Sequence, residues 1–129
     1  MSTDLKYLAF TAILTASLWI PYIACQVMTN GNLTPQNYVD PSPRKVPLWG
    51  MRANRAHLNA VETLAPFAVL VIVIHLAGKA NATTAFWAIV FFWTRVVHAV
   101  VYWVGIPYVR TLSFTLGYIA VLGLFWELL

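Results

Sequence analysis

The sequence predicts an all-α integral membrane protein, an antiparallel bundle of four transmembrane helices forming one domain over residues 1–129. Hydrophobic residues make up 60% of the chain and charged residues only 9%, whereas soluble domains carry about 25% charged residues. Four apolar stretches are long enough to cross a hydrocarbon core of about 30 Å, which takes about 20 helical residues. They lie at about residues 5–28, 54–76, 83–104 and 110–129.

The connections between these stretches explain the topology. Pro21 lacks an N–H group and frees the carbonyl of Ser17, so the first helix should be kinked. Residues 29–53 form a turn-rich surface loop, which contains Asn30-Gly31-Asn32 and Pro35, Pro41, Pro43 and Pro47. The other two connections, residues 77–81 and 105–107, are short, so neighbouring helices run antiparallel.

The distribution of charge predicts an orientation. The net charge is +4, but the basic residues are scattered, which does not indicate nucleic-acid binding. The first and third connections carry Arg44, Lys45, Arg52, Arg55 and Arg110 at or near helix ends, and the other side carries only Lys6 and Lys79. The positive-inside bias therefore places the first and third connections in the cytoplasm. A single cysteine, Cys25, lacks the partners of a metal cluster, so no metal site is predicted.

Polar residues recur on one face of the second helix. Arg55, Asn59 and Glu62 stand at positions i, i+4 and i+7, and Arg52 extends the same face outward. Ionisable residues within a membrane helix are costly, and so they indicate a paired structural site or a functional one.

The third helix shows the same spacing in reverse, with Tyr102, His98 and Arg95. In an antiparallel pair both sets descend about 10 Å from the cytoplasmic side, so they should meet level by level. The expected neighbours are Arg55 with Tyr102, Asn59 with His98, and Glu62 with Arg95. The last pair joins opposite charges at membrane depth and should form an ion pair.

This arrangement keeps an excess of positive charge. The one carboxylate, Glu62, cannot neutralise the four cations Arg52, Arg55, Arg95 and Arg110. The cavity should therefore suit an anionic guest. A peptide-like ligand with two carboxylates and one amine would fit, because arginine forks hold carboxylates while Glu62 or Asn59 meets the ammonium group.

Each of these residues also has a structural interpretation. The Glu62 and Arg95 pair could simply join two helices, and His98 could be a structural hydrogen-bonding residue. Arginines near helix ends can anchor the protein at lipid headgroups. Tyr102 could belong to an aromatic belt at the membrane surface.

Three ordered motifs fall on the second, third and fourth helices. They are Arg55-Ala56-His57-Leu58-Asn59 with Glu62-Thr63 and Pro66-Phe67, then Arg95-Val96-Val97-His98 with Tyr102, and finally Arg110-Thr111-Leu112-Ser113-Phe114 with Gly117-Tyr118. Together they resemble the MAPEG family, the membrane-associated proteins of eicosanoid and glutathione metabolism. The resemblance covers nearly the full chain. It is strongest to the branch of microsomal glutathione transferase 1 and its prostaglandin E synthase relative, and Leu58, Phe114 and Met28 depart from the synthase pattern.

The resemblance implies a homotrimer that binds glutathione as cosubstrate between adjacent protomers on the cytoplasmic side. By position, it implies that the glutathione contacts include Arg55, Asn59, Glu62, His98, Tyr102 and Arg110, and that Arg110 helps to stabilise the thiolate. The cationic face adds Arg52 and Arg95, and Thr111 and Ser113 are candidate hydroxyl donors.

These observations favour a membrane glutathione transferase of detoxification, with glutathione peroxidase activity as a further option. Its second substrate would be a hydrophobic electrophile from the bilayer, and the membrane a bacterial inner membrane or a microsomal one. A non-catalytic lipid-binding or scaffold protein of the same fold is the alternative. A small transporter is disfavoured, because no broken helix pair or inverted repeat is evident.

Overall fold

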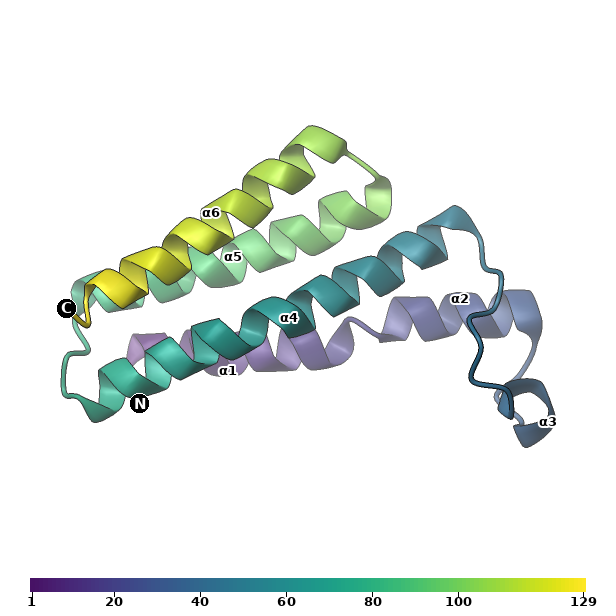
Figure 1. Cartoon of the computed structure of the whole chain (residues 1–129), viewed down its shortest axis with the longest axis horizontal. Coiled ribbons are helices and arrows are strands. Elements are labelled where there is room, and N and C mark those ends of the chain that lie inside the picture. Colours follow the sequence, from purple (N-terminus) through teal and green to yellow (C-terminus); the bar gives the residue numbers. More distant parts are fainter.

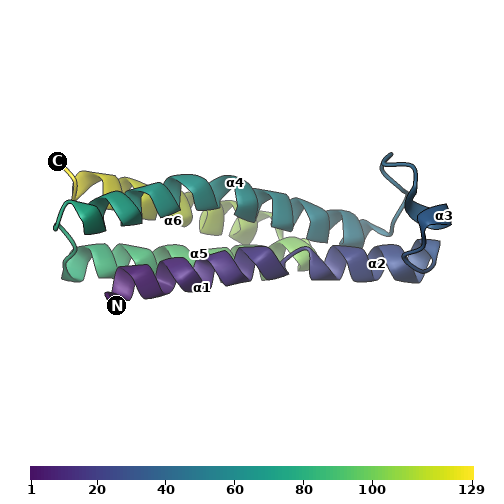
Figure 2. The ribbon, with the colours of Figure 1, turned by 90° about the horizontal axis from the view of Figure 1, so that it is seen from below.

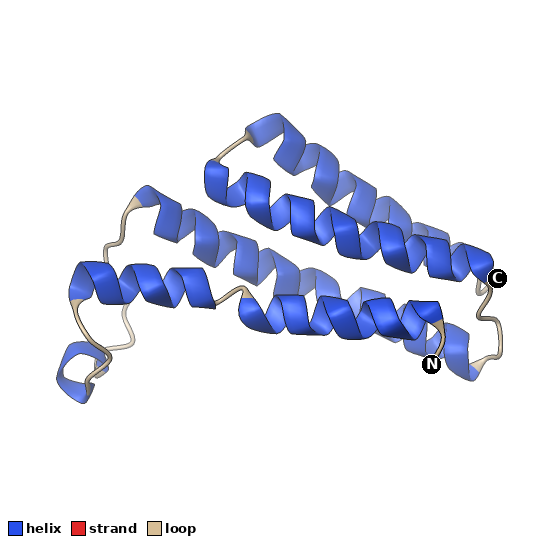
Figure 3. Ribbon diagram, turned by 180° about the vertical axis from the view of Figure 1, so that it is seen from behind, coloured by secondary structure: helices blue, strands red, loops and turns tan.

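The computed structural model describes residues 1–129 and is built of helices only (Figure 3). The helices are α1 (Thr3–Ser17), α2 (Ile20–Asn30), α3 (Pro35–Tyr38), α4 (Leu48–Leu76), α5 (Ala82–Val104) and α6 (Pro107–Trp126). Four segments are long and apolar enough to cross a membrane: Thr3–Asn30, Leu48–Leu76, Ala82–Val104 and Pro107–Trp126. The prediction of an all-helical chain with four long apolar helices is confirmed.

The first membrane span is interrupted near Pro21, where the sequence predicts a kink. The helix α1 ends at Ser17, and α2 begins at Ile20 with Pro21 in its first turn. Proline has no N–H group and its ring displaces the carbonyl four residues earlier, which kinks or breaks a helix, and here the helix is interrupted at Leu18 and Trp19. The two segments nevertheless follow one another along a common direction (Figure 2).

One additional short helix and the starts of two long helices differ from the sequence prediction. The long loop contains one helical turn, α3, whose first turn is capped by the Thr34 side chain, which accepts a hydrogen bond from the Asn37 N–H group. The helix α4 begins at Leu48 rather than near residue 54. The helix α6 begins at Pro107 rather than near residue 110, because proline is well suited to the first position of a helix.

The helices form an antiparallel bundle. Both termini lie at the end that holds the α4–α5 connection, and the long loop and the α5–α6 turn lie at the opposite end, here called the loop end (Figure 1). The helix α5 packs against α6, α4 and α1. The helices α2, α3 and the start of α4 extend beyond the α5–α6 turn (Figure 1).

The tightest core lies in the half of the bundle away from the loop end. Phe67 and Phe91 stack there with ring centroids 4.0 Å apart. The full cluster comprises Phe67, Val71 and Ile74 of α4, Ala88 and Phe91 of α5, and Ala120 and Leu124 of α6. Every residue of this cluster is apolar, and the polar cavity described below lies nearer the loop end.

Candidate functional site

A polar cavity of about 240 Å³ opens between α4, α5 and α6 near the loop end. It is lined by Asn59 of α4, by His98 and Tyr102 of α5, and by Arg110, Thr111 and Phe114 of α6. The structure thus brings together five of the residues that the sequence singled out as candidates. Asn59 and His98, predicted to share one level, line the same cavity.

The α5 wall of the cavity is aromatic. His98 and Tyr102 are four residues apart on one helix face, and their rings meet edge to face with centroids 5.4 Å apart. His98 is only 4% exposed. The guanidinium carbon of Arg110 lies 4.9 Å from the centroid of the Tyr102 ring, a cation–π geometry that fixes the arginine against α5.

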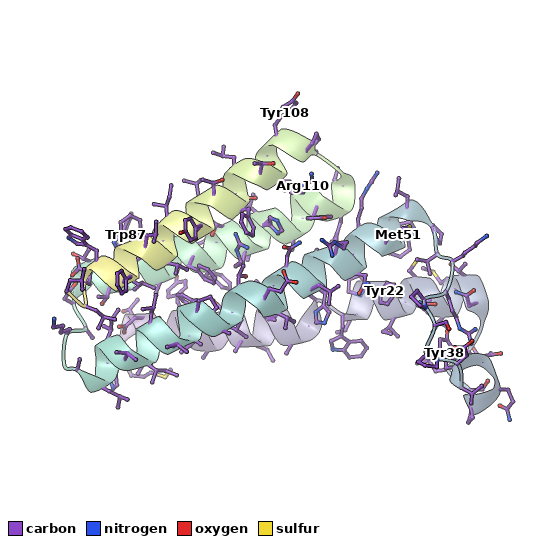
Figure 4. All side chains as sticks on the ribbon, viewed as in Figure 1. Tyr22, Tyr38, Met51, Trp87, Tyr108 and Arg110 are labelled. Carbon is purple, nitrogen blue, oxygen red and sulfur yellow. The ribbon has the colours of Figure 1, made fainter.

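The α6 wall is cationic. Arg110 lies in the first turn of α6, where its backbone N–H bonds to the carbonyl of Ile106. The N-terminus of a helix carries partial positive charge, which adds to the charge of the guanidinium. Arg110 lies between α5 and α6, whereas Tyr108 points away from the bundle (Figure 4). The cavity therefore presents positive charge to a guest.

Only one member of the predicted polar face of α4 lines this cavity. That residue is Asn59, whose side-chain amide donates to the carbonyl of Arg55 at 3.0 Å. Arg55 and Glu62 are exposed on the protomer surface. The buried face of α4 at this level consists of small residues, Gly50, Ala53, Ala56 and Ala60. Small residues let helices approach closely, and this packing turns Arg55 and Glu62 away from α5.

The predicted ion pair between Glu62 and Arg95 is wrong for the protomer. Arg95 is 3% exposed, and its Nη2 donates to the backbone carbonyl of Ser113 at 3.1 Å. Its Nε and Nη1 have no hydrogen-bond partner. The mirrored spacing predicts how deep Glu62 and Arg95 lie, but α4 is rotated about its axis so that Glu62 points out of the bundle.

Gly117 of α6 makes room for the buried guanidinium. A Cβ atom at this position would lie 2.4 Å from Nη2 of Arg95, far inside van der Waals contact. The side chain of Arg95 therefore crosses from α5 to α6 through the space that Gly117 leaves.

Arg52 lies outside the cavity and caps a helix. Its Nη1 donates to the carbonyls of Trp103 and Val104 at 3.5 and 3.3 Å, which belong to the last turn of α5 and need partners. Gly105 ends that helix with φ of 88°, and a Cβ atom there would lie 2.7 Å from the Arg52 guanidinium. Arg52, predicted to extend the cationic face of the second helix, thus makes its contact at the end of α5 instead of lining the polar cavity.

The two candidate hydroxyls differ in position. Thr111 lines the polar cavity and donates to the carbonyl of Pro107 at 3.2 Å. Ser113 instead lines an apolar groove on the other side of α6, with Trp93 and Leu116 among its neighbours, and its hydroxyl donates to the carbonyl of Arg110 at 2.9 Å.

A second, apolar pocket of about 120 Å³ lies deeper in the bundle, and sequence reasoning missed it. Its lining consists of Thr63 and Pro66 of α4, Phe91 and Arg95 of α5, and Phe114, Gly117, Tyr118 and Val121 of α6. The one sequence signal was the spacing of Phe114, Gly117 and Val121, which puts them on one helix face. Phe114 lines both cavities.

Comparison with known proteins places the chain in a family. No curated protein matches the sequence. The profile of the MAPEG family matches residues 5–129, which is almost the whole chain and includes every residue of both cavities. The protein therefore belongs to the MAPEG family.

Proposed function

We propose that the protein is a membrane glutathione transferase of the microsomal glutathione transferase 1 type, which conjugates glutathione to hydrophobic electrophiles. The observation that carries the proposal is the polar cavity, in which Arg110 meets His98, Tyr102, Asn59 and Thr111. Membership of a family concerned with glutathione and eicosanoid metabolism supports it.

The chemistry needs little from the protein beyond binding and charge. The thiolate is the reactive form of glutathione, and a nearby cation such as Arg110 favours it by lowering the pKa of the thiol. The thiol proton passes to water. The thiolate sulfur then forms a bond to the electrophilic carbon, and a leaving group such as chloride departs with the electron pair of the broken bond.

The same thiolate would serve a peroxidase reaction. Its sulfur attacks one oxygen of a lipid hydroperoxide, the O–O bond breaks, and the alcohol leaves after taking up a proton. A second glutathione then converts the sulfenic acid into a disulfide and water. Both reactions begin with a thiolate held near Arg110.

The direct test is a calorimetric titration of the detergent-solubilised protein with glutathione. Saturable binding is expected, and it should weaken as salt is added because the cavity is cationic. S-Methylglutathione is the matched ligand, since it keeps both carboxylates and the amine but cannot form a thiolate. It should bind and give no conjugate. A protein that binds neither peptide would instead be the lipid-binding or scaffold protein of this fold.

We also propose that the protein is a homotrimer whose glutathione site faces the cytoplasm of a bacterial inner membrane or a microsomal membrane. Arg55 and Glu62 lie within the second membrane span, yet both are exposed on the protomer. Exposed charges at membrane depth are costly in lipid. A neighbouring protomer would cover them and bring them to bound glutathione across the interface.

The assembly is tested by the mass of the protein in mild detergent. Light scattering with the detergent contribution subtracted should give three times the 14.5 kDa chain mass. A particle with the mass of a single chain would refute the trimer.

A further inference from the structure

We infer that the deep apolar pocket between α4, α5 and α6 receives the reacting group of the electrophile, and that Arg95 stabilises the negative charge this group acquires. This inference rests on the proposed conjugation reaction and names its substrate class. The substrates would be compact, uncharged molecules with an electron-accepting substituent, such as nitroarenes or conjugated carbonyl compounds.

The first argument is size and lining. The pocket has a volume of about 120 Å³ and is walled by Pro66, Phe91, Phe114 and Val121. An apolar cavity of about 150 Å³ holds a benzene molecule. The pocket is somewhat smaller than that cavity, so it can take at most one ring or a short unsaturated group, and a larger substrate must leave its remainder outside.

The second argument is access from the bilayer. Two lining residues of α6 are exposed on the protomer, Tyr118 at 58% and Phe114 at 42%. These residues lie within membrane spans, so the pocket opens toward lipid rather than toward water. A hydrophobic molecule dissolved in the bilayer can enter without crossing the polar cavity.

The third argument is adjacency to the thiolate. The Phe114 ring is the shared wall, with its centroid 6.0 Å from that of His98 on one side and 5.5 Å from the guanidinium carbon of Arg95 on the other. A glutathione sulfur held in the polar cavity near Arg110 and an aromatic ring of the electrophile held in the apolar pocket would thus approach each other beside the edge of the Phe114 ring.

The fourth argument is the charge of Arg95. Arg95 is 3% exposed, and two of its guanidinium nitrogens have no hydrogen-bond partner. No carboxylate neutralises it, since Glu62 faces outward. A charge fixed in a water-poor site acts strongly on charge that develops beside it.

The reaction develops such a charge. When the thiolate sulfur bonds to a ring carbon of a nitroarene, a π electron pair moves onto the ring and its nitro groups. With chlorodinitrobenzene the pair then returns and chloride leaves. Trinitrobenzene has no leaving group, so its coloured anionic adduct accumulates, and the visible absorbance measures charge stabilisation without turnover.

The test places a larger side chain in the pocket. Val121→Phe should reduce the adduct formed from trinitrobenzene and glutathione about 10-fold, within the range for steric exclusion from an apolar site, while glutathione affinity stays within about twofold. Leu122→Phe is the matched control, because Leu122 is exposed on the same helix. It should behave as wild type.

Two further variants keep the inference testable if Val121→Phe folds poorly. Val121→Ala should raise the preference for chlorodinitronaphthalene over chlorodinitrobenzene, since it widens the pocket. Arg95, a glutathione contact by the sequence prediction, does not line the polar cavity, so Arg95→Met should reduce the trinitrobenzene adduct while glutathione affinity is retained. Wild-type adduct levels in folded Val121→Phe would overturn the assignment of the pocket, and wild-type levels in Arg95→Met would overturn the role of Arg95. Absence of glutathione binding in the wild-type protein would be a different failure, that of the proposed function.

Discussion

Replacing Arg110 with alanine should lower the turnover number for chlorodinitrobenzene conjugation at least about 10-fold, equivalent to about 1.4 kcal/mol of transition-state stabilisation. Arg110 is the only cation that lines the polar cavity, and the charge of the α6 N-terminus alone is partial. The loss should appear in the rate of thiolate formation and of conjugation. Stopped-flow absorbance of the thiolate and steady-state assays would measure both.

Two other variants separate charge from geometry. Arg110→Lys keeps the charge but not the planar guanidinium that lies over Tyr102, so its turnover should be intermediate. Lys45→Ala removes an exposed cation of the long loop and should leave turnover unchanged. If folded Arg110→Ala conjugates at the wild-type rate, Arg110 has no part in the mechanism.

Gly117→Ala should destabilise the protein by about 2 kcal/mol, the cost of losing a hydrogen bond from a charged group. The usual effect of this change inside a helix is the opposite, a gain of about 0.5–1 kcal/mol. Here the new Cβ atom would lie 2.4 Å from Nη2 of Arg95. The guanidinium would have to leave the carbonyl of Ser113, and Phe91 and Phe114 limit where it can go.

The measurement is thermal unfolding in detergent, followed by circular dichroism. The same substitution in an Arg95→Met background is the control, because the shorter uncharged side chain can make room for the methyl group. The two changes should then be far from additive. A Gly117→Ala protein that melts at or above the wild-type temperature would contradict the described packing of Arg95.

The fold follows from hydropathy and proline positions with little else. Apolar stretches of membrane-spanning length predict the four spans, and Pro21 predicts a kink near the point where α1 ends and α2 begins. The start of α4 escaped prediction because the prolines that precede it make the whole segment resemble a loop. Yet residues after Pro47 carry no helix breaker until Pro66, apart from Gly50, which packs against Cys25.

The sequence predicts the level of each site residue along its helix but not the direction in which its side chain points. Equal spacing along two antiparallel helices placed Asn59 and His98 in one cavity, since the rise per residue is fixed. Which way each side chain points depends on how α4 is rotated about its axis. Ala53, Ala56 and Ala60 decide that rotation, because they allow the closest approach to the neighbouring helices. Pairing charges by depth alone therefore predicts an ion pair between Glu62 and Arg95, whereas the packing of α4 keeps the two side chains apart.

The unequal lengths of the spans shape how the two substrates of the proposed reaction would arrive. At 1.5 Å per residue, the 29 residues of α4 extend about 43 Å and the 20 residues of α6 about 30 Å, and only the latter matches the hydrocarbon thickness. The surplus of α4 stands with α2 beyond the α5–α6 turn (Figure 1). The bundle thus ends in a step. With α6 filling the hydrocarbon core, Arg110 in its first turn would lie at the base of this step, near the lipid headgroups. Water-soluble glutathione would then reach Arg110 from the aqueous side above the shorter helices. The lipophilic electrophile would reach it laterally from the acyl chains. Bilayer thickness would then influence the proposed reaction, because a thicker hydrocarbon layer would cover Arg110 and the mouth of the polar cavity.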